Sequence, residues 1–183
     1  IFLRHAETKK DPDIPVSKWV ITKEGARKVE DIADSGIFDD VDIIISSAET
    51  KAYQTAEPIA KRLNIDITQM SELSEVDRDK GGFMTKEKYD EMKSKIFEDL
   101  DFTDCGWETS CHALERFKLG IEKINQEYNN KKILITSHGT VMTLYFAYLQ
   151  NDMDNLMKRW KSLGFCDYAI IEKGKVTRDT PSI

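Results

Sequence analysis

Arg4 and His5 are the first side chains of the sequence that could do chemistry, and they directly follow the apolar run Ile1-Phe2-Leu3. No turn residue separates the run from the two polar side chains, so they lie where a predicted buried strand ends. In open α/β sheets, ligands bind beside the carboxyl ends of the strands. An arginine and a histidine at such a place are suited to an anion, although an exposed arginine and a structural histidine explain the pair equally well.

The same arrangement occurs twice more in the chain. Val41–Ile45 is an apolar run that ends in two serines and leads to Lys51, and Ile133–Thr136 leads to a Ser-His-Gly sequence that contains His138. If the three runs are neighbouring strands of one parallel sheet, their four cationic or potentially cationic side chains converge at one edge. The sequence therefore predicts a phosphate-binding pocket there.

Five blocks of sequence around these positions resemble the motifs of the histidine phosphatase superfamily, which also contains the cofactor-dependent phosphoglycerate mutases. In the family's order they are Arg4-His5-Ala6-Glu7-Thr8, Ser46-Ser47 through Lys51 to Ala56, Leu73-Ser74-Glu75, Gly106-Trp107-Glu108-Thr109 followed by Arg116-Phe117, and Ser137-His138-Gly139. One block would be weak support, whereas five in the same order are specific.

This resemblance implies a phosphomonoester hydrolase that needs no metal or other cofactor. His5 would attack phosphorus through a neutral ring nitrogen and form a phosphohistidine, and a backbone carbonyl would have to hold its other nitrogen in the correct tautomer. Glu75 would act as the general acid and then as the general base, for which burial would have to raise its pKa. His138 would be the third catalytic residue.

The resemblance also implies that Arg4, Lys51, His138 and Thr8 bind the phosphate. Most members of the family carry Arg where this chain has Lys51, and many carry Asn where it has Asp11. A lysine keeps the charge but not the two-pronged geometry of a guanidinium. Because Ser-Ser-x-Glu-x-Lys-Ala resembles one branch of the family, we interpret Lys51 as functional. The carboxylate of Asp11 would repel a phosphate unless it points away.

Composition narrows the class of partner. Lys and Arg number 27 against 33 Asp and Glu, a net charge of -6, so the chain lacks the cationic surface that nucleic-acid binding needs. We expect a small phosphorylated substrate or a phosphoprotein, and the oligomeric state is left open. Three cysteines without C-x-x-C spacing favour neither disulfides nor a zinc site, which predicts a cytoplasmic protein. Neither a signal peptide nor an apolar stretch of about 20 residues predicts membrane insertion.

Alternating strand and helix patterns predict a single α/β domain over residues 1–183, with a mostly parallel central sheet and helices on both faces. The predicted strands are residues 1–3, 41–45, 65–70, 133–136, 168–171 and 176–178, the last two forming a hairpin. The predicted helices are residues 22–36, 49–63, 107–128, 140–149 and 156–160. His112, on the third of these helices, has no acidic or histidine partner at ligand spacing, so we interpret it as a surface or structural residue.

Residues 76–106 are predicted to form a small cap over the site. Its polar helix, within residues 84–104, has an apolar stripe that we expect to pack rather than to contact substrate, made of Tyr89, Met92, Ile96 and Phe97. The side chains that could reach a leaving group are Arg78, Lys80 and Trp19.

The sequence also allows two other functions, a mutase and a binding module. A mutase would pass the phosphoryl group from His5 back to a substrate after priming by a bisphosphorylated cofactor, but the short cap argues against it because a mutase must exclude water. A binding module would keep the phosphate pocket without catalysis. Lys51 and Asp11 motivate that possibility, and the presence of His5, His138 and Glu75 argues against it.

Overall fold

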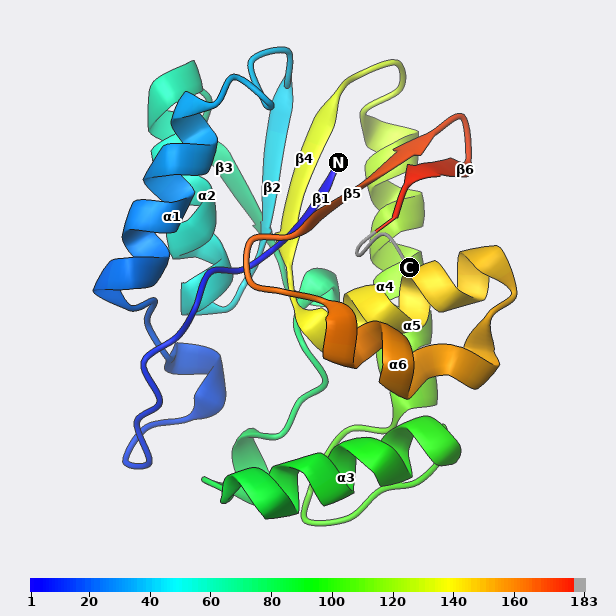
Figure 1. Ribbon diagram of the computed structural model, residues 1–183. Coiled ribbons are helices and arrows are strands. Elements are labelled where there is room, and N and C mark those ends of the chain that lie inside the picture. The colour runs from blue at the N-terminus through cyan, green and yellow to red at the C-terminus, as the bar shows by residue number, and fades with distance from the viewer. Residues whose placement is uncertain (180–183) are drawn as a thin grey trace.

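The computed structural model describes residues 1–179, and the last four residues of the predicted domain, 180–183, lie outside the described part. As predicted, the fold is α/β, with a six-stranded, mostly parallel sheet between helices (Figure 1). The strands are β1 (Phe2–Arg4), β2 (Ile43–Ser47), β3 (Ile67–Met70), β4 (Ile133–Ser137), β5 (Tyr168–Glu172) and β6 (Lys175–Arg178). The helices are α1 (Lys23–Asp34), α2 (Thr50–Leu63), α3 (Lys86–Glu98), α4 (Ser110–Glu127), α5 (Gly139–Gln150) and α6 (Leu156–Ser162). None of these described helices is long and apolar enough to span a bilayer.

Strand β4 lies at the centre of the parallel part of the sheet, between β1 and β2. Arg4 of β1 pairs with Ser137, and Ile45 of β2 pairs with Ile135. The order β3-β2-β4-β1-β5-β6 makes the three strands of the predicted pocket neighbours, so their carboxyl ends lie at one edge. Strands β5 and β6 form an antiparallel hairpin beside β1.

Strand β2 begins and ends two residues later than predicted. The prediction ended this strand at its first polar residue, but Ser46 and Ser47 continue it and are fully buried. Their hydroxyl groups have local partners, because Ser46 donates to the Ser47 carbonyl at 2.7 Å and Ser47 accepts from the Glu49 backbone N–H at 3.1 Å. Satisfied hydroxyl groups can be buried at little cost.

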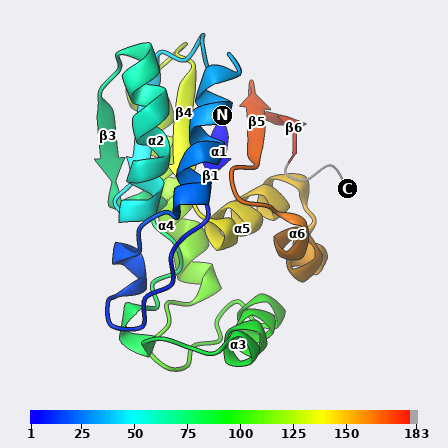
Figure 2. The same cartoon turned by 60° about the vertical axis from the view of Figure 1, so that its left-hand side comes forward.

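Different helices cover the two faces of the sheet (Figures 1 and 2). Ile44 belongs to the apolar cluster that contains Ile59 of α2, on the face covered by α1 and α2. The next residue, Ile45, belongs to the cluster that contains Phe117 of α4 and Phe146 of α5. Successive strand residues point to opposite faces, so this central strand contributes to both cores.

The cap helix α3 lies beyond the carboxyl ends of the parallel strands (Figures 1 and 2). Thr85 caps its N-terminus by accepting a hydrogen bond from the Lys88 backbone N–H at 3.3 Å. Met92 and Ile96 are fully buried in the same cluster as Trp107. Met92, Ile96 and Phe97 of the apolar stripe therefore pack as predicted and hold the cap against the body of the domain, whereas Tyr89 also lines the cavity described below.

Candidate active site

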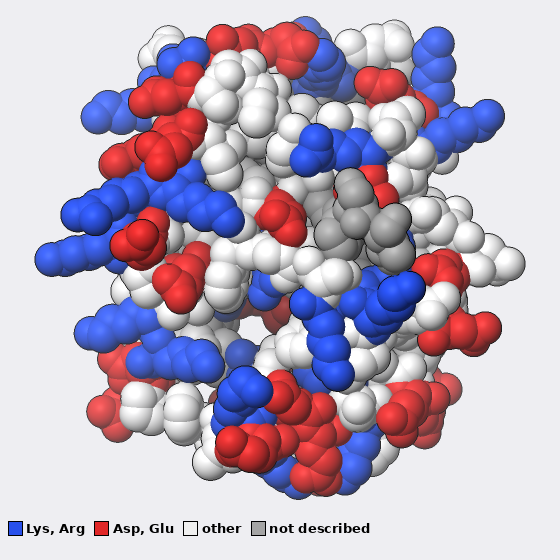
Figure 3. Space-filling model, in the orientation of Figure 1, with Lys and Arg blue, Asp and Glu red and all other residues white. Residues whose placement is uncertain are grey.

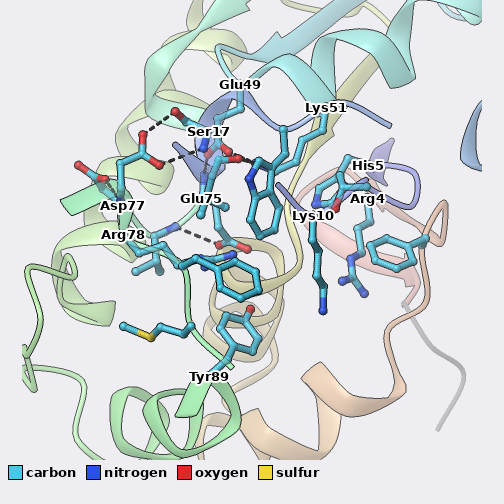
Figure 4. A pocket seen from close by; sticks show the side chains of 18 of the residues that line it. Arg4, His5, Lys10, Ser17, Glu49, Lys51, Glu75, Asp77, Arg78 and Tyr89 are labelled. Atoms are coloured by element: carbon cyan, nitrogen blue, oxygen red, sulfur yellow. Dashed lines mark hydrogen bonds and ion pairs between the residues drawn. The ribbon is translucent and has the colours of Figure 1, made fainter. Parts of the chain in front are cut away.

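A cavity of about 300 Å³ lies between the carboxyl ends of β1 and β2 and the cap (Figure 4). In the space-filling view, acidic and basic side chains are interspersed over this face, which is hollowed beside the cap (Figure 3). The predicted site residues that line the cavity are Arg4, His5, Thr8, Lys51, Glu75 and Arg78. Trp19 lines the cavity as well, whereas Lys80 and His138 do not.

His5 directly follows β1 and has only 7% of its surface exposed. Its Nδ1 lies 2.7 Å from the carbonyl oxygen of Ala6, and because a carbonyl only accepts, Nδ1 carries the proton. This is the backbone carbonyl that the sequence argument required. Burial, together with the nearby His138, Lys51 and Arg4, holds the pKa of His5 well below its usual value of 6.5. His5 is therefore a neutral imidazole at pH 7, with the lone pair on Nε2.

His138 follows β4 and packs against His5, with ring centroids 5.1 Å apart. Its Nε2 lies 2.7 Å from the Ser47 hydroxyl and 3.5 Å from a carboxylate oxygen of Glu49. Its Nδ1 is buried and has no hydrogen-bond partner within residues 1–179. Burial is the main cause that lowers the pKa of His138, so this ring is also neutral. His138 thus lies behind the cavity wall, and its contact with a bound phosphate stays a prediction.

The Lys51 side chain is buried at the start of α2, where a carboxylate compensates its charge. Its Nζ donates to the Val16 carbonyl at 3.0 Å and contacts the carboxylate of Glu49. Glu49 also accepts from the backbone N–H of Glu75 at 2.7 Å. Sequence analysis missed Glu49, although it precedes Lys51 by two residues in the second motif block. Two of the three ammonium donors of Lys51 are used in this way, which leaves one for a ligand.

Arg4 ends β1, and its guanidinium lies 4.5 Å from the ring centroid of Phe165. Its Nη1 donates to the Leu163 carbonyl, and its Nε is buried without a hydrogen-bond partner in the described part of the chain. A Cβ atom at Gly139 would lie 3.1–3.3 Å from the guanidinium atoms. The glycine of the Ser-His-Gly block therefore leaves the space that Arg4 occupies.

The carboxylate of Glu75 lies at the N-terminus of α5. It accepts from the Thr140 backbone N–H at 3.0 Å, the Thr140 hydroxyl at 2.9 Å, and the backbone N–H groups of Val141 at 3.2 Å and Val76 at 3.0 Å. Burial alone would raise the pKa of Glu75, but Lys93 and the backbone donors outweigh burial and lower it. The predicted raised pKa is therefore wrong for this structure, because these groups stabilise the charged form.

Arg116 of α4 holds the segment that carries Glu75. Its guanidinium donates to the carbonyls of Glu72 at 2.8 Å and Glu75 at 3.1 Å, and it pairs with Glu108 at 2.8 Å. The fourth motif block therefore fixes the backbone around the site. His112 is exposed, as predicted, but its Nδ1 lies 2.6 Å from Glu108, so the inference that it lacks an acidic partner is wrong. The partner lies one helical turn earlier in the chain.

Asp11 points away from the cavity. Its carboxylate accepts from the backbone N–H of Asp13 at 3.0 Å, and the residue is not part of the cavity wall. Its carbonyl accepts from the indole N–H of Trp19 at 2.8 Å, which places that ring beside the cavity. The repulsion that Asp11 would exert on a phosphate therefore does not arise.

Sequence analysis missed several residues around the cavity. Lys10 and Phe165 line it, and Lys93 is fully buried behind it. Lys93 lies four residues after Tyr89 and four before Phe97, so the helical spacing of the apolar stripe indicates that it faces inward. No comparable pattern marks Lys10 or Phe165. Residues 1–179 contain no group of three or more His, Cys, Asp or Glu side chains placed to hold a metal ion.

We expect acid to destabilise the fold between pH 7 and pH 5.5, because His5 and His138 are held neutral in the folded state. Unfolded histidines titrate at about pH 6.5, so the unfolded chain binds protons in this range that the folded chain does not. The free energy of unfolding should therefore decrease as the pH is lowered from 7 to 5.5, by about 1 kcal/mol for each histidine. Urea unfolding at the two pH values measures this loss.

The control for this measurement is Leu119→Gln on α4, since Leu119 is 54% exposed and neither side chain titrates. This variant should keep the full pH dependence, whereas His5→Gln should lose about half of it. Equal pH dependence in His5→Gln and the unmodified protein would contradict the neutral assignment of His5.

Comparison with known proteins shows the family to which the chain is similar. The histidine phosphatase superfamily (branch 1) matches residues 1–179. PhoE, an uncharacterized phosphatase of Bacillus subtilis, is 32% identical over 102 residues, covering 55% of this chain and 49% of PhoE, so the chain aligns with about half the length of that relative. Phosphoserine phosphatase 1 of Hydrogenobacter thermophilus is 27% identical over 183 aligned positions, covering 92% of this chain and 82% of the relative.

Solved structures show the same fold. A mycobacterial glucosyl-3-phosphoglycerate phosphatase has a TM-score of 0.76 at 16% identity, covering 92% of this chain and 86% of its own. Phosphoserine phosphatase from Entamoeba histolytica, in complex with 3-phosphoglyceric acid, has a TM-score of 0.75 at 21% identity, covering 98% of this chain and 96% of its own. Because the family model matches residues 1–179, the chain belongs to the histidine phosphatase superfamily.

Proposed function

We propose that the protein hydrolyses phosphate monoesters through a phosphohistidine on His5. The hydrogen bond from Nδ1 of His5 to the Ala6 carbonyl carries this proposal, because it leaves a neutral Nε2 as the nucleophile on the cavity wall. Nε2 bonds to phosphorus as the bond to the leaving oxygen breaks. Water then attacks phosphorus, the P–N bond breaks, and inorganic phosphate leaves.

Arg4, Lys51, Thr8 and His138 are the proposed phosphate-binding residues. The buried Nε of Arg4 has no partner within residues 1–179, and Lys51 has one ammonium donor beyond its two protein contacts. At about 4 Å and an effective dielectric near 20, a unit charge contributes up to roughly 4 kcal/mol before desolvation. Only the part of this energy that grows in the transition state accelerates the reaction.

Glu75 is the proposed general acid and base. It lies on the same cavity wall as His5, and it must be protonated when the leaving alcohol departs. A phosphate dianion in the cavity repels the carboxylate and so raises its pKa, which means that substrate binding itself favours protonation. Glu75 gives this proton to the leaving oxygen and then takes one from the attacking water, so it is protonated again when the phosphohistidine has been hydrolysed.

Hydrolysis is proposed rather than transfer to a second substrate, because the cap is small. Its one α-helix, α3, has 13 residues, and a mutase must keep water away from its phosphoenzyme. We place the enzyme in the cytoplasm, where thiols such as the exposed free cysteines Cys105 and Cys111 stay reduced.

Hydrolysis of an aryl phosphate should persist in a metal chelator and be lost in His5→Ala. Without the imidazole no phosphoenzyme forms, so we expect kcat to fall by at least about 10³-fold. The matched control is His112→Ala, which should keep full activity because that ring is exposed on α4. Turnover that requires added bisphosphoglycerate would instead support a mutase, and phosphate binding without any turnover would support a binding module.

Arg78 is proposed to bind a second anionic group of the substrate, such as a carboxylate. Its guanidinium lies 4.9 Å from the ring centroid of Tyr89 and 5.6 Å from those of Trp19 and Trp107. Its Nε is buried and has no hydrogen-bond partner among residues 1–179. The rings hold the guanidinium in place without using its donors, which suits it to a planar carboxylate.

Arg78→Met should lower kcat/KM for phosphoserine and 3-phosphoglycerate by about 10- to 100-fold, the effect of losing one charged hydrogen-bonded pair. Phenyl phosphate, which has no second anionic group, should change by less than about threefold. Lys80→Met is the control, because Lys80 is near in sequence but not in the cavity wall. Equal losses on all three substrates would refute a role in carboxylate binding.

A further inference from the structure

Lys93 of the cap helix is fully buried, which is unusual for a lysine. Its Nζ lies between four aromatic rings, at 5.4 Å from the centroid of Tyr89, 5.7 Å from Phe97, 5.5 Å from Trp107 and 5.7 Å from Trp160. An ammonium has three donors, and within residues 1–179 the one hydrogen-bond partner of Nζ is the hydroxyl of Thr140. The ammonium is therefore poorly solvated, so its proton is held weakly.

The hydroxyl of Thr140 connects Lys93 to the proposed general acid. It accepts from Nζ of Lys93 and donates to the carboxylate of Glu75 at 2.9 Å. The hydrogen bonds form a continuous buried path from Nζ–H of Lys93 through Oγ1–H of Thr140 to the carboxylate of Glu75. A proton can move along this path without passing through solvent. Neither Lys93 nor Thr140 belongs to the cavity wall, so the cap contacts the carboxylate through buried groups and not across the cavity.

We propose that Lys93 and Glu75 share one proton through the Thr140 hydroxyl, so that Lys93 is the proton reservoir of the general acid. This inference rests on the proposed function of Glu75. Nζ gives a proton to Oγ1 as Oγ1 gives its own to the carboxylate, which leaves a neutral amine and a carboxylic acid. Glu75 then protonates the leaving oxygen. Lys93 touches no substrate, so it is a positioning residue.

The charges around Lys93 suit this exchange. The groups that face it are Glu75 and Arg78 from the segment before α3, Arg4 from β1 and Tyr89 from α3 itself. Burial lowers the pKa of Lys93 to about 7, against the opposing attraction of Glu75. Burial also raises the pKa of Tyr89 to about 12, so Tyr89 stays neutral and takes no part. Among the charged groups in the described part of the chain, Arg78 and Arg4 favour release of the proton, whereas Glu75 favours its retention. The four aromatic rings also favour retention, because their faces attract the ammonium.

The test is the pH dependence of phosphoenzyme formation in single turnovers, with an alkyl phosphate that needs a proton on its leaving oxygen. The rate declines at high pH, and this decline is the basic limb of the pH–rate profile. If the two groups share a proton, the basic limb reports loss of that proton from the pair, so Lys93→Met should move the limb to lower pH by at least about one unit. At pH values above the pKa that this limb reports, the rate falls about tenfold for each pH unit. 2,4-Dinitrophenyl phosphate, whose leaving group needs no proton, should react within about threefold of the original rate.

The sign of the shift separates the proposal from a purely electrostatic role. A permanently charged Lys93 would only lower the pKa of Glu75, so its removal would move the basic limb to higher pH. A limb that is unchanged or moves upward in Lys93→Met would therefore overturn the proposal. Lys95→Met, an exposed lysine of the same helix that pairs with Glu91, is the matched control and should not move the limb.

Variants of Thr140 test the link if Lys93→Met does not fold. Thr140→Val removes the hydroxyl and should shift the limb as Lys93→Met does, and Thr140→Ser should restore it. An unshifted limb in Thr140→Val would overturn the shared proton while leaving catalysis by His5 intact. Absence of His5-dependent turnover in the unmodified protein would overturn the proposed function and this inference together.

Discussion

Strand β4 pairs in parallel with β1 on one side and with β2 on the other, and the whole site depends on that pairing. It places the residues that follow three strands at one edge of the sheet, so Arg4, Lys51 and His138 come from distant parts of the chain to one place. The two apolar cores hold the sheet from both faces, and α5 begins directly after β4. Its N-terminus then supplies backbone donors to Glu75.

Charge compensation is the second constraint on the site. A buried ammonium or carboxylate is costly unless a group of opposite charge lies near it. In this site Lys51 is compensated by Glu49, and Glu75 is compensated by Lys93. Glu49 contacts Lys51 and also accepts from the backbone N–H of Glu75. It therefore links a proposed phosphate-binding residue to the proposed general acid. Lys93 compensates Glu75 from the cap. The site is therefore organised by its own ion pairs before a phosphate enters, which limits the reorganisation that catalysis requires.

The sequence predicted most of the fold, because strands that end in polar residues and helices with apolar spacing are local signals. The proposed catalytic residues came instead from the resemblance of the motifs to those of the family. Sequence analysis predicted the wrong direction for the pKa of Glu75. That direction depends on the N-terminus of α5 and on Lys93, which are far from Glu75 in sequence and are brought to it only by packing. Glu49 was missed for a similar reason, since a single carboxylate in a loop gives no sign of its partners.

The mass-spectrometric location of the phosphoryl group tests the central claim most directly. Glu75→Gln should slow hydrolysis of the intermediate, so alkaline quenching of this variant during turnover of an aryl phosphate should trap the phosphoenzyme. The account predicts one phosphate per chain on His5, and none after His5→Ala in the same background. Turnover with the phosphate on another residue, or with no covalent phosphate at all, would contradict it.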